Sequence, residues 1–144
     1  MSSRKSGFRS MRAAMLSLTG LLSLTSLSFG AVLTTEAEIR QAMVGNTVSG
    51  IEDGKSYTDY YQPDGYIHGV EPEGSYVGEW RIAGRSFCVR YFDKQEGADG
   101  EEVGSGSIGA WECMGVEIQG SLFAWIKDGE RYKAQLVPGN PNKL

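Results

Sequence analysis

The sequence predicts a single mainly β domain, an antiparallel up-and-down barrel of about eight strands with one short N-terminal helix. Turn signals recur at the spacing of strands, and pairs such as Asp53-Gly54 and Asp128-Gly129 supply residues that adopt positive φ in tight hairpins. The 144 residues include 20 Gly, 7 Tyr, 5 Phe and 3 Trp, a composition that favours short strands over a helical bundle. A meander of that many strands tends to close, because closure removes the exposed sheet edges.

The first thirty residues predict a secretory leader. An apolar stretch covers residues 13–27, and Ser28-Phe29-Gly30 places small residues where a signal peptidase cleaves. Four basic residues precede the apolar stretch, namely Arg4, Lys5, Arg9 and Arg12. The stretch is shorter than the ~18 residues that a membrane span requires. We therefore expect removal of residues 1–30, a single domain over 31–144, a periplasmic or secreted location, and no membrane insertion after cleavage.

Charge excludes two classes of partner. The leader holds four of the 14 basic residues and none of the 18 acidic ones, so the remainder has 10 basic and 18 acidic residues, a formal charge of −8. Such a protein repels phosphate backbones and anionic head groups, and no basic patch with interleaved aromatic residues is present. Nucleic acid is therefore not an expected partner.

The first element after the leader is predicted to be a helix over residues 34–46. Thr34 or Thr35 can cap it, and Gly45 supplies a C-terminal stop. Ile39 and Met43 lie four residues apart on one face, so they can plug one end of a β structure.

After this helix, turn signals divide the chain into segments of the length of strands. The predicted strands cover residues 46–51, 55–61, 65–70, 74–82, 86–92, 110–118, 121–127 and 131–137. Alternation places one face of the strand at 74–82 inward, with Tyr76, Gly78, Trp80 and Ile82. In two strands the alternation does not decide which face points inward. In the strand at 86–92, the inward residues are either Phe87, Val89 and Tyr91 or Cys88, Arg90 and Phe92. In the strand at 121–127, they are either Phe123 and Trp125 or Leu122, Ala124 and Ile126.

Cys88 and Cys113 are the only two cysteines, and export favours a disulfide between them. The alternative is two buried thiols that pack as small hydrophobic side chains. Zinc needs four good ligands, whereas this chain offers the two cysteines and a single histidine, so no metal site is expected.

One connection, residues 93–109, is too long for a hairpin and has no apolar periodicity. Its glycines match a dinucleotide-binding pattern by letter, but the pattern requires a preceding strand and a following helix, which are not predicted here. Its acidic residues suggest calcium, yet Gln95 and Gly97 occupy positions where a calcium loop needs acidic or amide ligands. A solvated acidic loop is the alternative, and no cofactor is expected.

Aromatic residues crowd into the first strands, where they either pack the core or form a ligand site. No nucleophile elbow accompanies the single histidine, so we predict no catalytic residues. The candidate ligand-binding residues are Tyr57, Tyr61, Tyr76, Trp80, His68 and Trp125.

Four stretches of the sequence resemble a family of small exported bacterial domains, mostly without assigned activity. They are Gly45-Asn46-Thr47-Val48-Ser49-Gly50, the residues from Asp53-Gly54 through Tyr57 and Tyr60-Tyr61 to Pro63-Asp64-Gly65, Tyr76-x-Gly78-x-Trp80-Arg81-Ile82, and Pro138-Gly139-Asn140-Pro141. The resemblance implies a Gram-negative origin and a periplasmic address. In plan the chain is similar to lipocalin-like (calycin-like) and avidin-like barrels, which bind small molecules, and to small barrel inhibitors of exported enzymes.

Two functions follow as hypotheses. The first is an exported non-enzymatic binding protein that holds a small apolar or aromatic ligand at the barrel mouth. The second is a periplasmic protein-interaction module, an inhibitor or an envelope-assembly factor, that presents the acidic 93–109 loop to a protein of the envelope. An interior cavity above roughly 300 Å³ would favour the ligand hypothesis, whereas a filled barrel would favour the outer surface.

Overall fold

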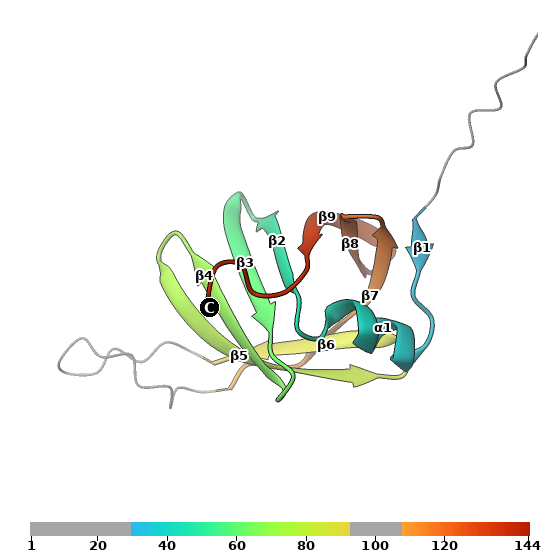
Figure 1. Cartoon of the computed structure of the whole chain (residues 1–144), viewed down its shortest axis with the longest axis horizontal. Helices are drawn as coiled ribbons and strands as arrows, with labels where there is room; N and C mark the ends of the chain where they lie inside the picture. Colours follow the sequence, from blue (N-terminus) through green and yellow to red (C-terminus); the bar gives the residue numbers. More distant parts are fainter. Residues whose placement is uncertain (1–29, 93–107) are drawn as a thin grey trace, which may run out of the picture.

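The computed structural model describes residues 30–92 and 108–144, and these form one helix and nine strands (Figure 1). The helix α1 spans Glu36–Met43. The strands are β1 (Ala31–Val32), β2 (Thr47–Glu52), β3 (Lys55–Tyr61), β4 (Tyr66–Glu71), β5 (Gly74–Ala83), β6 (Ser86–Tyr91), β7 (Glu112–Gln119), β8 (Leu122–Lys127) and β9 (Glu130–Val137).

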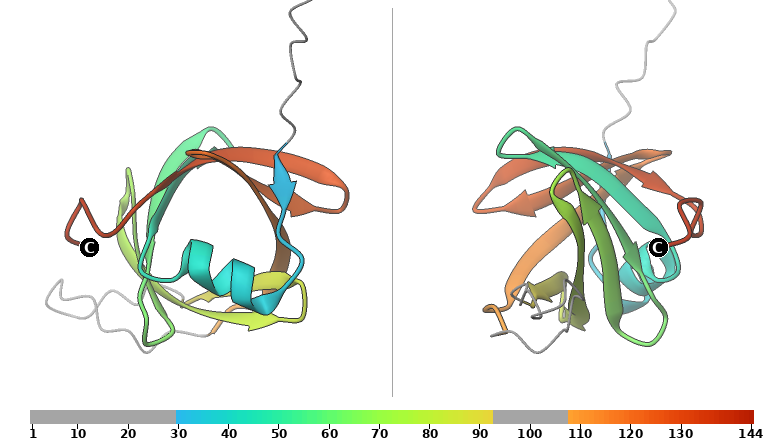
Figure 2. Two further views of the ribbon diagram at one scale, coloured as in Figure 1. Left: turned by 45° about the vertical axis from the view of Figure 1, so that its right-hand side comes forward. Right: turned by 90° about the vertical axis from the view of Figure 1, so that its left-hand side faces the viewer.

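Strands β2 to β9 form a closed antiparallel barrel in which each strand pairs with the next along the chain. The ring closes between the first and the last of them, where Thr47 pairs with Val137 and Gly50 pairs with Ala134. Figure 2 shows the resulting ring. The predicted eight-stranded, calycin-like up-and-down barrel is confirmed. The short strand β1, which was not predicted, pairs with β7 outside this ring and begins at the residue after the predicted cleavage site.

The Asp-Gly turn signals form tight hairpins. Asp53 and Gly54 have φ values of 49° and 80°, and Asp128 and Gly129 have values of 54° and 82°. Two consecutive residues with positive φ match the right-handed twist of the flanking strands, and glycine and aspartate adopt that conformation with little strain. These turns fix the register of the β2–β3 and β8–β9 pairs.

The helix plugs one end of the barrel, which we call the closed end. Thr35 caps α1 in a reciprocal capping box with Glu38, so the predicted N-terminus is confirmed. Ile39 and Met43 are fully buried in the core cluster. Figure 2 shows α1 lying across one opening of the ring.

Aromatic side chains fill the barrel behind this helix. Phe87 stacks on Trp80 with ring centroids 5.4 Å apart, and on its other side it stacks on Trp125 at 5.9 Å. The predicted inward face of β5 is confirmed. Burial also decides the two faces that alternation left open, because Phe87, Val89, Phe123 and Trp125 belong to the core cluster while Leu122 is 61 % exposed.

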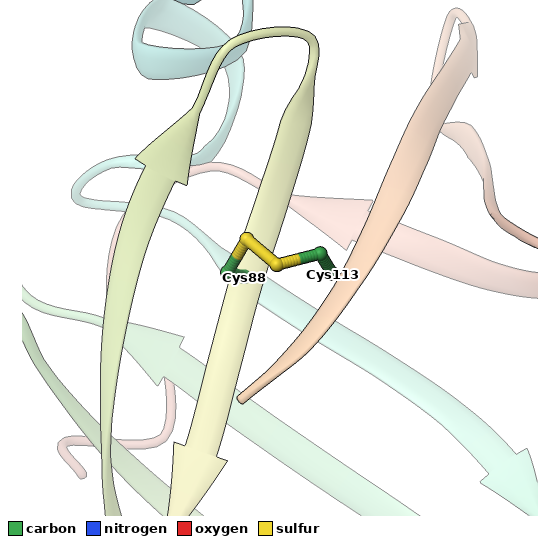
Figure 3. Close-up of a disulfide and its surroundings, with 2 residues drawn as sticks. All are labelled: Cys88 and Cys113. Carbon is green, nitrogen blue, oxygen red and sulfur yellow. A yellow bond between two sulfur atoms is a disulfide. The ribbon is translucent and has the colours of Figure 1, made fainter. Parts of the chain in front are cut away.

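The predicted disulfide between Cys88 and Cys113 is present (Figure 3). The two residues lie directly opposite each other on β6 and β7. Cys88 follows Phe87, whose ring points into the barrel, so its side chain leaves the opposite face of the sheet. The bridge therefore joins the two strands from outside the barrel without occupying the interior.

Candidate ligand site at the open end of the barrel

An open cavity of about 750 Å³ occupies the end of the barrel opposite α1. The turns joining β2 to β3, β4 to β5 and β8 to β9 surround this end, which we call the open end. Aromatic side chains make up much of the wall: Tyr57, Tyr61, Tyr76, Tyr91, Trp125 and Tyr132. A volume of this size is typical of small-molecule sites. The barrel is thus packed at its closed end and hollow at its open end.

A buried carboxylate lies in the wall of the cavity. Asp59 belongs to β3, where it alternates with Tyr57 and Tyr61 and so points inward with them. Asp59 is only 2 % exposed to solvent. The hydroxyl of Tyr76 donates to Oδ1 at 2.5 Å, and the hydroxyl of Tyr91 donates to Oδ2 at 2.8 Å. Tyr61 also donates to Oδ2, at 3.4 Å.

Burial sets the protonation chemistry of this cluster. Removal of Asp59 from water raises its pKa to about 6, although the three phenol hydrogen bonds act in the opposite direction. Burial also raises the pKa of Tyr76 and of Tyr91, and the negative charge of Asp59 raises both further. The phenols therefore remain protonated donors at neutral pH, while Asp59 titrates close to neutrality.

Three inward tyrosines each lie across a glycine of the neighbouring strand. These cross-strand pairs are Gly50 with Tyr57, Gly69 with Tyr76 and Gly78 with Tyr91. At Gly69, a Cβ atom would stand 2.1 Å from the Tyr76 ring and 2.5 Å from Asp59 Oδ1. Only a residue without a side chain leaves room for the tyrosine to cross the strand and reach the carboxylate. The glycines of β2, β4 and β5 thus position the hydroxyl groups of the site.

Substituting Gly69→Ala is expected to lower the free energy of unfolding by about 1–3 kcal/mol, because the Tyr76 ring must move out of an overpacked position. Urea unfolding measures the change. Gly115→Ala is the matched control, since Gly115 also lies within a strand but its added Cβ would meet Ile126 Cβ at 3.3 Å. The control is expected to change stability by less than about 1 kcal/mol. Equal effects of the two substitutions would contradict this role of Gly69.

Four of the six candidate ligand-binding residues meet at the cavity: Tyr57, Tyr61, Tyr76 and Trp125. The indole Nε1 of Trp125 donates to the Tyr57 hydroxyl at 3.1 Å, which links β8 to β3 inside the barrel. The structure therefore brings together aromatic residues from β3, β5 and β8.

The other two candidates lie elsewhere. Trp80 is buried near the closed end, where its indole Nε1 donates to the Gln62 carbonyl at 2.8 Å and Arg40 of α1 lies over its ring. His68 is paired with Tyr60 and Val77 on the outer face of the sheet, because its neighbours Ile67 and Gly69 point inward. Neither residue lines the cavity.

Sequence reasoning did not single out Asp59 or Tyr91 as site residues. The spacing Tyr57-x-Asp59-x-Tyr61 was the available signal, since residues two apart share one face of a strand. An acidic residue between two inward tyrosines indicates a buried carboxylate with hydroxyl partners. Tyr60, on the other face of the same strand, concealed this signal because both faces then carry tyrosine.

The rim of the cavity carries charges of both signs. Lys127 pairs with Glu112 at 2.9 Å, and Lys55 pairs with Glu73 at 2.6 Å. All four side chains are well exposed to solvent. Exposed pairs of this kind contribute about 0–1 kcal/mol to stability, so they add little to the stability of the fold.

Residues 93–107 of the acidic loop lie outside the described residues, and so do residues 1–29 of the predicted leader. In the described ranges, no cluster of three or more His, Cys, Asp or Glu side chains has an arrangement that could hold a metal ion. The helix of the described part of the chain lacks the length and apolar character of a membrane span.

Comparison with known families, curated proteins and solved structures gave no match: no family model fits the sequence, and no similar curated protein or solved structure was found.

Proposed function

We propose that this protein is an exported, non-enzymatic binding protein that holds a small ligand with an apolar or aromatic body in the open end of its barrel. The cavity of about 750 Å³ is the observation that carries the proposal. It exceeds the roughly 300 Å³ at which small-molecule sites begin, and its wall combines aromatic rings with a few convergent polar groups. Rings such as those of Tyr57 and Trp125 offer flat apolar surface with a polar edge.

The chemistry of the wall supports binding over catalysis. The two cysteines are joined on the outside of the barrel, and His68 lies on the outer face of the sheet. The phenols near Asp59 have raised pKa values and act as hydrogen-bond donors to it. These groups hold one another in place, an arrangement suited to a preformed site.

The predicted leader and the disulfide support a location outside the cytoplasm, where disulfides persist. The resemblance to small exported Gram-negative domains favours the periplasm. A ligand encountered in that compartment would reach the cavity through the open end, while α1 covers the other end.

Binding is expected to quench the fluorescence of Trp125, which lines the cavity. The purified protein is titrated with a panel of apolar, aromatic and amphipathic compounds, and its thermal unfolding is followed in parallel. Any compound that binds the folded state raises the melting temperature as its concentration rises above Kd.

Two tryptophan substitutions make the assay specific. Trp125→Phe is expected to abolish most of the quenching, whereas Trp111→Phe should leave it intact, because the Trp111 ring packs against Arg81 and Arg90 and does not line the cavity. Unchanged fluorescence and unchanged melting temperature across the whole panel would contradict the proposed function.

A further inference from the structure

The carboxylate of Asp59 lacks a cationic partner within the described part of the chain. Its hydrogen-bond partners there are three neutral phenols, and the charged residue that acts on it most strongly is Glu52, which is also acidic. A carboxylate can accept about four hydrogen bonds, so three phenols leave one acceptor position open. The negative charge of Asp59 is thus solvated by hydroxyl groups but not neutralised.

The remaining charges of the cavity do not supply that neutralisation. The other acidic residues of the wall are Glu52, Asp53, Glu71 and Glu112. Its basic residues are Lys55, Lys127 and Lys133. The amines of Lys55 and Lys127 already bind Glu73 and Glu112 at the exposed rim. The cavity therefore has an excess of negative charge, and its most buried charged group is an acid.

The aromatic rings around Asp59 suit a positive charge. Tyr76 and Tyr91 meet edge to face, with ring centroids 5.4 Å apart and planes at 85°, and both hydroxyls converge on the carboxylate. The faces of such rings attract ammonium groups, and the attraction grows when the site is shielded from water. A carboxylate among aromatic rings is a chemically apt receptor for an organic cation.

The energetics of folding also favour a cationic ligand. A buried ionised carboxylate without a cationic partner destabilises the empty protein, and an apolar residue in its place would not. A bound cation would offset this penalty by pairing with Asp59. The buried position of Asp59 would then be stabilised by the same cation that the site binds.

We propose that the ligand of this cavity is a small organic cation, a protonated amine on an apolar or aromatic body, whose charged group binds at Asp59 among the tyrosine rings. This inference rests on the proposed function and adds the chemical class of the ligand. The apolar body would lie against Trp125 and Met114, which also line the cavity.

Three probes with one ring and different head groups test the inference. They are 2-phenylethylamine, 2-phenylethanol and 3-phenylpropionate, titrated into the purified protein by calorimetry at about pH 8, where the amine is still protonated. The amine is expected to bind at least about tenfold more tightly than the alcohol, and the carboxylate most weakly.

A pH series on the unaltered protein gives a second, independent measurement. Protonation of Asp59 removes its charge, so affinity for the amine should fall by up to about tenfold per pH unit below the pKa of about 6. The charge of the alcohol does not change, so its affinity should not follow this titration. The ratio of the two affinities therefore cancels pH effects that both ligands share, and a midpoint near pH 6 is the one expected for Asp59.

Asp59→Asn is expected to bring the ratio of amine to alcohol affinity close to one. Glu36→Gln is the matched control, because it neutralises an exposed acid of α1 at the closed end, and it should leave the ratio unchanged. If the asparagine variant does not fold, the pH series still decides.

Each other outcome overturns the inference. Equal or tighter binding of the alcohol or the carboxylate would reject the cationic class while leaving a small-molecule site in place. Absence of binding by all three probes at millimolar concentration would reject it as well. The proposed function falls only if the broader panel of compounds also fails to bind.

Discussion

Replacing Cys88 and Cys113 together with alanine is expected to lower the free energy of unfolding by about 3–4 kcal/mol. The bridge closes a loop whose ends are 25 residues apart, and in the chain-entropy model a crosslink of that span restricts the unfolded chain by this amount. The effect should be large because β6 and β7 pair only through residues 87–89 and 112–114, the shortest ladder of the barrel, and the chain between them runs from residue 92 to residue 111.

Urea unfolding of the double variant and of the reduced natural protein measures this contribution. Reduction breaks the crosslink but keeps both sulfur atoms, so it separates the effect of the crosslink from the packing volume that the alanines remove at the fully buried Cys88. The two measurements should agree to within about 1–2 kcal/mol. A loss below about 1 kcal/mol in both would show that the β6–β7 ladder does not need the bridge.

Local signals explain why so much of the barrel could be predicted. The helix is encoded by Thr35 and Glu38, which satisfy each other's backbone donors, and the β2–β3 and β8–β9 hairpins by Asp-Gly pairs at the turns. Closure between β2 and β9 has no local signal, and it was predicted from the general instability of exposed edges. The strand β1 was missed because two residues are too few to show an alternation.

The faces of β6 could not be decided from its sequence for a different reason. Cys88 is fully buried although its side chain leaves the outer face of the sheet, while Phe87 and Val89 are buried inside the barrel. Both faces of the strand therefore carry buried apolar residues, so alternation does not identify the inward face.

The candidate site shows a second limit of periodic patterns. Tyr76 and Trp80 share the inward face of β5, yet four residues of extended strand place them about 13 Å apart, at opposite ends of the barrel. Alternation predicts the face on which a residue lies but not its depth. Only the position of α1 shows that Trp80 lies near the closed end and Tyr76 near the open end.

Between about pH 4 and pH 8, the free energy of unfolding of Asp59→Asn is expected to rise by about 3 kcal/mol relative to that of the natural protein. The folded pKa of Asp59 is about 6, against 3.8 for an unperturbed aspartate, and each unit of difference corresponds to about 1.4 kcal/mol. Because the folded value is the higher one, the stabilisation from Asp59 is complete below about pH 4 and is lost as the pH rises through 6. The natural protein should therefore lose stability relative to the variant over this window.

Urea unfolding of both proteins at several pH values between about 3.5 and 8 measures the difference, and every group common to both cancels. Glu36→Gln is the control, since its carboxylate pairs with Arg40 in solvent, and its difference should vary by less than about 1 kcal/mol. A flat difference for Asp59→Asn, or one of opposite sign, would mean that a positive charge already balances Asp59. That result would also remove the unneutralised carboxylate from which the cationic ligand was inferred, so the stability measurement bears on the ligand class before any ligand is tested.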